Sequence, residues 1–265
     1  MDIILLLKAF LLGIVEGATE FLPVSSTGHL IIVGDLLNFN DARGKVFEIV
    51  IQLGAILAVC WEYRVKIAYT LGNVAEPASR RLIVNLALAF LPAALLGFAF
   101  HDVIKIYLFS PITVAWALIV GGFAILLIEK YAPPPDTATV DDMDWKHALK
   151  VGCAQCLSLI PGVSRAGATI LGGVMFRLSR RAATEFSFFL AIPIMFAATG
   201  FDVLTSWDDL HADDFSVFAA GFVTAFFSAL LVVRGLLRFV AHHDFRAFAW
   251  YRIVFGALVL WYFWP

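Results

Sequence analysis

Two acidic side chains stand four residues apart near the beginning of the chain, inside an otherwise apolar stretch. A helix places Glu16 and Glu20 on one face, with their Cβ atoms about 6 Å apart. Inside a bilayer a carboxylate is costly unless it is paired, protonated or bound to a metal. We therefore expect both carboxylates to share a positively charged partner. The alternative is a position at the external interface, where they would simply face water.

A hydroxyl-rich segment follows these carboxylates and leads into an apolar helix. It reads, in order, Pro23-Val24-Ser25-Ser26-Thr27-Gly28-His29. Proline ends the preceding helix, and Ser25, Ser26 or Thr27 can cap the next one, whose first N–H groups and positive dipole end form an anion site. One cap needs only one hydroxyl, so the remaining polar groups call for another explanation. We interpret His29 as a general acid or base and a neighbouring serine as a candidate nucleophile.

A similar break recurs in the second half of the chain. It reads Pro161-Gly162-Val163-Ser164-Arg165-Ala166-Gly167-Ala168-Thr169. Arg165 carries a permanently charged fork of five donors in an apolar stretch, where a cation is costly. We expect its partner to be a phosphate, and the alternative is an ion pair with a glutamate that ties the two halves together. Two helix starts, one arginine, hydroxyls, a histidine and two carboxylates together favour a phosphate site with room for a divalent cation.

The composition indicates that these residues work inside a membrane. The chain has 265 residues, of which 61% are hydrophobic and 15% charged, and its mean hydropathy is +0.88. Soluble domains carry about 25% charged residues, so this chain has too few ionic groups to cover a surface that faces water. With a net charge of −2 it also lacks a basic patch for polyanions. A soluble enzyme, a disordered chain and a nucleic-acid binder are excluded.

Apolar segments predict an all-α polytopic membrane protein. A spanning helix needs about 20 mostly apolar residues. Six predicted spans cover about 47–62, 83–100, 111–129, 184–204, 215–237 and 247–264. Two further apolar stretches, about 3–37 and 149–176, are interrupted by the proline-containing breaks. Such breaks persist at membrane depth only inside protein or beside a wet cavity, so we predict two broken re-entrant hairpins.

Charged loops predict the orientation of the spans. Segments 61–82 and 234–246 are rich in Lys and Arg, whereas segment 202–214 contains five Asp and neither Lys nor Arg. The positive-inside rule then places the first two in the cytoplasm and the third outside. Counting crossings puts both termini outside and the linker 131–148 inside. Tyr251 and the nearby tryptophans are interpreted as anchors at the membrane interface.

The two halves of the single membrane domain, residues 1–265, resemble each other. An offset of 139 residues aligns Glu16 with Gln155, Ser25 with Ser164, and Gly28 with Gly167. We predict a first repeat over 1–130 and a second over 149–265, each consisting of one broken hairpin and three spans. Because three is odd, the second repeat must enter the membrane inverted, and the two hairpin tips then meet near the midplane.

At these residues the chain closely resembles the undecaprenyl-diphosphate phosphatases, the bacitracin-resistance family of bacterial membrane enzymes. The matching stretches are 16–29 and 161–169, and the resemblance extends over nearly the whole chain. Ala166 departs from the family, which often has a second serine after the arginine, so that hydroxyl is not expected to be essential here. The resemblance implies hydrolysis of undecaprenyl diphosphate to undecaprenyl phosphate and inorganic phosphate in the bacterial plasma membrane, which recycles the lipid carrier of cell-wall synthesis and confers bacitracin resistance.

The same resemblance implies a dependence on Mg²⁺ or Ca²⁺ and a role for each residue. Glu16 and Glu20 would bind the metal or activate the attacking group, Ser26 would be the favoured nucleophile, and His29 would handle a proton. The expected phosphate-binding residues are Arg165, Ser164, Thr169, Ser25 and Thr27. Whether Ser26, His29 or water attacks the phosphorus stays open at this point.

Another class of function shares this architecture. Inverted repeats and broken helices at the midplane also occur in secondary transporters, so a transporter or flippase for a polyprenyl phosphate is the alternative. A second lipid-phosphatase family, with a histidine nucleophile after Ser-Arg, fits poorly because no histidine follows Arg165 before His211. The expected partners are the polyprenyl diphosphate and membrane lipids, without nucleic acid, and a homodimer is one candidate for the oligomeric state.

Overall fold

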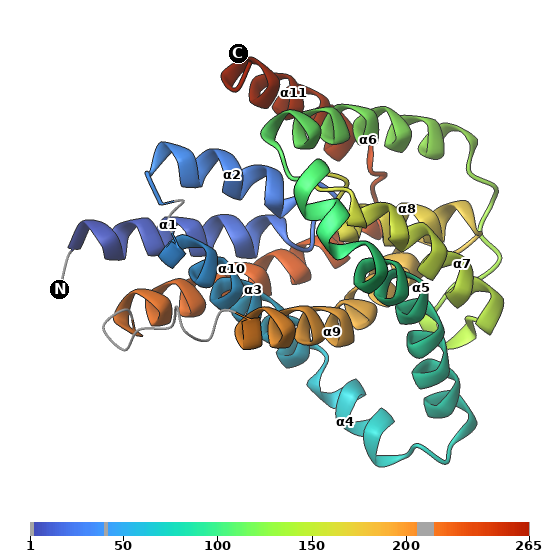
Figure 1. Cartoon of the computed structure of the whole chain (residues 1–265). Coiled ribbons are helices and arrows are strands. Elements are labelled where there is room, and N and C mark those ends of the chain that lie inside the picture. Colours follow the sequence, from blue (N-terminus) through green and yellow to red (C-terminus); the bar gives the residue numbers. More distant parts are fainter. Residues whose placement is uncertain (1–2, 40–41, 206–214, 265) are drawn as a thin grey trace.

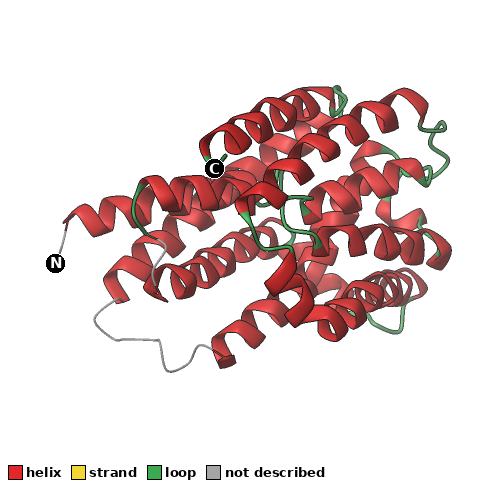
Figure 2. Ribbon diagram, turned by 45° about the horizontal axis from the view of Figure 1, so that its top comes forward, coloured by secondary structure: helices red, strands yellow, loops and turns green. Residues whose placement is uncertain are grey.

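The computed structural model of the chain describes residues 3–39, 42–205 and 215–264, and every regular element within these ranges is a helix. Short loops connect the helices (Figure 2). The first half contains α1 (Ile3–Thr19), α2 (Ser26–Leu36), α3 (Ala42–Glu62), α4 (Arg64–Gly72), α5 (Pro77–Tyr107) and α6 (Pro111–Tyr131). The second half contains η1 (Val140–Asp142), α7 (Trp145–Gln155), η2 (Cys156–Leu159), α8 (Arg165–Met175), α9 (Arg180–Thr205), α10 (Phe215–Val240) and α11 (Arg246–Tyr262). The predicted all-α class is confirmed.

Four helices are long and apolar enough to cross a membrane, namely α5, α6, α9 and α10. A fifth candidate is the pair α3 and α4, which is bent by 73° at its break. The sixth predicted span, 247–264, corresponds to α11, whose 17 residues extend about 26 Å, less than a hydrocarbon core of about 30 Å. The structure therefore supports a multi-pass membrane protein with four or five span candidates, and the count of six stays a prediction. Much of the acidic segment 202–214 lies outside the described residues.

Local sequence explains where several helices begin. The Ser110 side chain accepts a hydrogen bond from the Thr113 N–H over 3.1 Å, and Pro111 opens α6. At α7 the Asp144 carboxylate accepts from the His147 N–H over 2.9 Å. Both caps satisfy a backbone donor that has no partner within its own helix, and proline at the first position has no such donor to lose.

Both predicted breaks are present and share their geometry. The chain is interrupted between α1 and α2 and again between η2 and α8, and the helices that follow are each 11 residues long and start 139 residues apart. Ser25 and Ser164, directly before them, both have a left-handed backbone, with φ of 70° and 76°. Asn38 and Arg177, which follow these helices, repeat the coincidence at the same offset, with φ of 49° and 69°. Non-glycine residues seldom adopt this conformation, so the shared positions indicate a common local design.

The helices before the breaks pack against long helices of the opposite half. In Figure 1, α1 lies along α10 and α7 along α5, while α6 and α11 run side by side. Glycine makes the first of these contacts close. A Cβ atom at Gly13 would lie 2.5 Å from the Gly221 carbonyl oxygen, and one at Gly17 would overlap the Ala225 carbonyl oxygen. The helix before each break is thus held by a long helix of the other half of the chain.

The linker between the halves docks onto the first half. Lys66 of α4 forms an ion pair of 2.9 Å with Asp141 of η1, and the Asn85 side chain of α5 donates to the Met143 carbonyl oxygen over 2.9 Å. These contacts fix the start of α7, and so the second break, relative to α5.

Candidate active site

An ion pair joins the two breaks. Arg165 Nη2 donates to Glu20 Oε1 over 2.9 Å, and the two side chains are only 12% and 9% exposed. A second contact crosses the same boundary, since Ser164 Oγ donates to the Leu22 carbonyl oxygen over 3.4 Å. Arg165 therefore forms the ion pair with a glutamate that the sequence offers as the alternative to a phosphate. It also places the carboxylate and the guanidinium within reach of one diphosphate.

Ser26 extends this ion pair toward the first turn of α2. Its Oγ donates to Glu20 Oε2 over 2.5 Å, so one carboxylate binds the hydroxyl with one oxygen and Arg165 with the other. Ser25 occupies the N-cap position of α2, but its side chain makes no capping hydrogen bond. Ser26 and Thr27 are half-buried in this first turn. The turn therefore offers N–H donors and the positive dipole end to an anion, next to the Ser26 hydroxyl.

His29 lies one turn further along α2 and is bound at both ring nitrogens. Its Nδ1 is 2.7 Å from the Ser25 carbonyl oxygen, and its Nε2 is 2.6 Å from the Tyr251 hydroxyl. A carbonyl oxygen only accepts, so Nδ1 carries a hydrogen, and in the neutral ring Nε2 accepts from Tyr251. The ring also stacks on Phe255 with centroids 4.1 Å apart. His29 is thus fixed in orientation by α11.

Glu16 lies deepest among the acidic residues of the site. It is 1% exposed, and its Oε2 is buried without a hydrogen-bond partner. Within the described ranges, no three His, Cys, Asp or Glu side chains gather in an arrangement that could hold a metal ion. A protein-only cage is therefore not formed by these residues. The Glu16 oxygen suits the other common arrangement, in which one or two carboxylates hold Mg²⁺ together with substrate phosphates.

The hydroxyls around Arg165 already have partners. Ser164 Oγ accepts from the Gly167 N–H over 3.0 Å and so caps α8. Thr169 is fully buried and lies 2.6 Å from the Ser187 hydroxyl of α9, while the Ser187 carbonyl oxygen accepts from Arg165 Nη1 over 3.3 Å. Both side chains hold α8 and Arg165 in place, and their predicted contact with phosphate stays a prediction.

A mostly apolar cavity of about 460 Å³ lies next to Arg165. It is formed by α5, η2 and α9, with Phe98 and Phe201 among its lining residues. Arg165 and Asp202 are its charged lining residues. The guanidinium thus borders both the polar contacts of the breaks and a space suited to a hydrocarbon chain.

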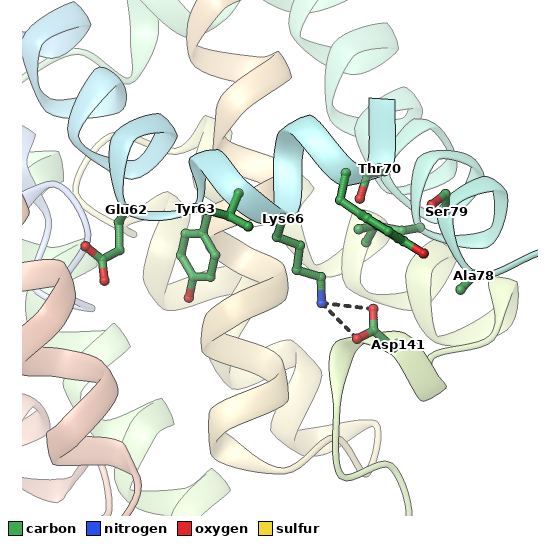
Figure 3. Close-up of a pocket in the computed structure, with 10 residues that line it drawn as sticks. Glu62, Tyr63, Lys66, Thr70, Ala78, Ser79 and Asp141 are labelled. Atoms are coloured by element: carbon green, nitrogen blue, oxygen red, sulfur yellow. Dashed lines mark hydrogen bonds and ion pairs between the residues drawn. The ribbon is translucent and has the colours of Figure 1, made fainter. Parts of the chain in front are cut away.

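A second cavity, of about 580 Å³, lies apart from the breaks. Figure 3 shows it between α4, the start of α5 and the linker, with the Lys66–Asp141 ion pair at its edge. None of the predicted site residues lines it. We therefore assign it no part in the site.

Three residues of the site were missing from the sequence prediction. Tyr251, an expected interface anchor, binds His29 through its hydroxyl. Arg252 is 1% exposed and hydrogen-bonds to both breaks, and Ser187 supports Arg165. For Arg252 a signal existed, because one arginine inside an apolar stretch is as costly as Arg165. The pairing of Tyr251 with His29 depends on residues 222 positions apart, and spacing carried no sign of it.

A family model described as bacitracin resistance protein BacA matches residues 9–258. The chain belongs to this family. The matched part of this BacA-family chain includes both breaks and every residue predicted for the site.

Relatives of this BacA-family chain are similar over nearly their whole length. A protein of Nitrosospira multiformis is 66% identical over 261 residues, covering 98% of this chain and 96% of its own. A protein of Nitrosomonas europaea is 60% identical, covering 98% and 95%, and one of Methylobacillus flagellatus is 60% identical over the full length of both. All three are named undecaprenyl-diphosphatase.

Proposed function

We propose that this protein hydrolyses undecaprenyl diphosphate to undecaprenyl phosphate and inorganic phosphate in a bacterial plasma membrane. The observation that carries the proposal is the chain of contacts from Ser26 through Glu20 to Arg165, which joins a hydroxyl, a carboxylate and a guanidinium across two breaks. Membership of the BacA family and relatives named undecaprenyl-diphosphatase support the substrate. The expected consequences are recycling of a cell-wall lipid carrier and bacitracin resistance.

Charge neutralisation accounts for much of the proposed catalysis. The diphosphate takes the place of Glu20 as the partner of Arg165, because a phosphate binds the planar guanidinium fork in a similar way. The N-terminal turn of α2 adds backbone donors and a positive dipole end on the side of Ser26. Phosphoryl transfer needs mainly positioning and electrostatic stabilisation, and these groups supply both.

Ser26 is the nucleophile in this proposal. Its Oγ forms a bond to the terminal phosphorus while the bridging P–O bond breaks and undecaprenyl phosphate leaves, and its proton passes to Glu20 Oε2, 2.5 Å away. Water then attacks the phosphoserine and releases inorganic phosphate. The water proton passes to His29 Nε2 in place of the Tyr251 hydrogen bond, and from there to the medium. Glu20 returns its proton to Ser26, which restores the hydroxyl.

A divalent cation, Mg²⁺ or Ca²⁺, fits the acidic residues of the site. Glu16 would hold it with its unpartnered buried oxygen, and Glu20 and the substrate phosphates are further oxygen donors. When bound, the cation would neutralise part of the diphosphate charge. The prenyl chain would lie in the apolar cavity beside Arg165.

We also propose the inverted repeat with six spans and both termini outside. The matching 11-residue helices and the paired left-handed residues support two equivalent halves. The helix contacts between the two halves follow the same pattern. The first span candidates of each half, α3 and α9, contact each other, as do the third, α6 and α11, while the second, α5 and α10, each receive the broken hairpin of the other half. That pattern is expected of two halves related by a two-fold axis.

We propose a homodimer as the oligomeric state, to be tested by the mass of the protein–detergent complex.

The decisive experiment measures inorganic phosphate released from undecaprenyl diphosphate by the protein purified in detergent, with and without a chelator. We expect turnover that needs no gradient, a loss of at least about 1,000-fold for Arg165→Ala, and no change for the exposed control Arg234→Ala. Chelation is expected to abolish turnover, and Mg²⁺ or Ca²⁺ to restore it. Movement of the lipid in sealed vesicles without phosphate release would instead establish the transporter.

A further inference from the structure

Arg252 of α11 is among the largest fully buried side chains of the described residues, with 1% exposure. All of its hydrogen bonds go to backbone carbonyl oxygens. Its Nη1 donates to the oxygens of Pro23 and Val163 over 3.1 and 2.9 Å, which belong to the first and second break respectively. The other acceptors are the oxygens of Gly162 (3.0 Å) and Ala117 (3.1 Å) at Nη2 and of Leu118 (3.4 Å) at Nε.

The five donors of the guanidinium thus meet five carbonyl oxygens. Within the described part of the chain, the ion pairs of 4.0 Å or less do not include Arg252. A buried cation is costly, and here backbone dipoles rather than a carboxylate offset that cost. Among the described residues, the positive charge of Arg252 therefore has no acid as its ion-pair partner, close to the breaks.

The planar guanidinium of Arg252 joins two segments that lie far apart in the sequence. Pro23 lies three residues before Ser26, and Val163 lies two residues before Arg165. A shift of either break relative to Arg252 would break a hydrogen bond to a buried donor. Gly121 of α6 makes room for the fork, because a Cβ atom there would overlap Arg252 Nη2. The first break, the second break and α6 therefore together form the space that the guanidinium occupies.

We propose that Arg252 is a positioning residue, which holds the two breaks in register so that Ser26 and Arg165 act on one diphosphate. This inference rests on the proposed phosphatase function. Tyr251, the neighbour of Arg252, binds His29. One turn of α11 therefore contacts the break that precedes Ser26, the break that precedes Arg165, and His29. A lysine ammonium has three donors and no planar fork, so it cannot replace these contacts.

The test compares kcat and KM of Arg252→Ala, Arg252→Lys and the control Arg246→Ala, an exposed arginine at the start of the same helix. We expect both Arg252 variants to lose about 100-fold in kcat, as a misplacement of about 1 Å does, and the control to stay within about twofold. Guanidinium added to Arg252→Ala is expected to restore at least about a tenth of kcat by filling the vacated site, whereas ammonium restores none.

A milder pair of variants covers the case in which Arg252→Ala does not fold. Gly121→Ala places one methyl group against the fork and leaves both breaks unchanged in sequence, while Gly235→Ala adds a methyl group where no atom lies within 4 Å. We expect Gly121→Ala to lower kcat about tenfold with its unfolding temperature in detergent still measurable, and Gly235→Ala to leave kcat unchanged.

Two results would overturn the proposal. One is a kcat for Arg252→Lys or Gly121→Ala within about twofold of the wild type. The other is folded but inactive Arg252→Ala that guanidinium does not rescue, because the guanidinium contacts would then not be what is missing. Failure of the underlying function looks different, since the wild-type protein itself would release no phosphate.

Discussion

At the scale of single residues, one carboxylate links the reacting groups. Glu20 binds Arg165 through one oxygen and Ser26 through the other, so it neutralises a buried cation and orients a hydroxyl at once. The tie between the halves and the candidate catalytic site are therefore the same contacts. In the proposed mechanism the diphosphate displaces Glu20 from Arg165, and Glu20 accepts the Ser26 proton.

Replacing this carboxylate by its amide tests that double role. We expect Glu20→Gln to lower kcat for phosphate release by about 1,000-fold, because an amide cannot take the Ser26 proton and leaves Arg165 without its charge partner. The matched control is Glu62→Gln, since Glu62 pairs with Arg234 away from the breaks. Turnover of Glu20→Gln close to that of Glu62→Gln would remove Glu20 from the mechanism.

The hydroxyl that holds His29 can be removed on its own. We expect Tyr251→Phe to lower kcat about three- to tenfold, because one hydrogen bond that orients the imidazole is lost while the aromatic ring remains. The control is Tyr262→Phe in the same helix, because the Tyr262 hydroxyl binds Asp35 and not His29. Equal rates for both variants would mean that His29 needs no orientation from α11.

At the scale of elements, the breaks work because rigid helices hold them. α1 approaches α10 so closely that only glycine fits at two positions, Gly13 and Gly17, and α7 is fixed by its cap and by the linker. Each break can then expose N–H groups and polar side chains without loosening the protein around it. The helices before the breaks are therefore as important for the site as the breaks themselves.

A side chain at the α1–α10 contact should separate the two helices. We expect Gly17→Val to lower the free energy of unfolding by about 1–3 kcal/mol, because its Cβ would overlap the Ala225 carbonyl oxygen and lie 2.7 Å from the Ala229 nitrogen. The unfolding temperature in detergent measures the loss. Gly200→Val, in a helix with no atom within 4 Å of the added Cβ, is the control, and equal temperatures for both would contradict a tight α1–α10 contact.

The cap of α7 makes a prediction about pH. The hydrogen bond from the His147 backbone N–H holds the pKa of Asp144 below its ordinary value. A carboxylate with a lowered pKa stabilises the fold above its ordinary pKa, and this contribution is lost as the pH falls through the lowered value. We expect Asp144→Ala to cost about 1 kcal/mol at pH 7, and the difference from wild type in unfolding temperature to shrink below about pH 4. A difference that stays constant with pH would contradict this role of the cap.

At the scale of the whole molecule, the proposed inverted repeat explains why two distant breaks meet. If the halves enter the membrane from opposite sides, hairpins that do not cross completely end at a common depth, where polar groups shelter one another. The packing of α1 against α10 and of α7 against α5, each between opposite halves, is consistent with this arrangement.

Single cysteines test the orientation. In a variant in which Cys60, Cys153 and Cys156 are serines, we expect Phe109→Cys to react with a membrane-impermeant maleimide in spheroplasts, and Asp141→Cys to react only after permeabilisation. Both side chains are exposed, so access to the reagent depends on the side of the membrane. The opposite labelling pattern would invert the proposed topology.

Residue types and short-range spacing are enough to indicate a membrane environment, an all-α fold and the residue types of the candidate site. The chain has too few charged residues to cover a surface that faces water. Proline and glycine mark two breaks, and acidic residues, hydroxyls and Arg165 lie beside these breaks in the sequence. These properties are local, since they follow from residue type and from spacing within a few turns. The number of membrane spans does not follow from such local properties, because α11 is short and α4 bends away from α3.

Which of these groups contact one another depends on the tertiary structure. It selected Glu20 rather than Glu16 as the partner of Arg165, engaged the Ser164 and Thr169 hydroxyls in holding α8, and brought Tyr251 and Arg252 to the breaks. The contacts of Glu20, Tyr251 and Arg252 join residues more than a hundred positions apart, and they depend on how helices cross. Packing of whole elements sets those crossings, so no short-range spacing rule encodes them.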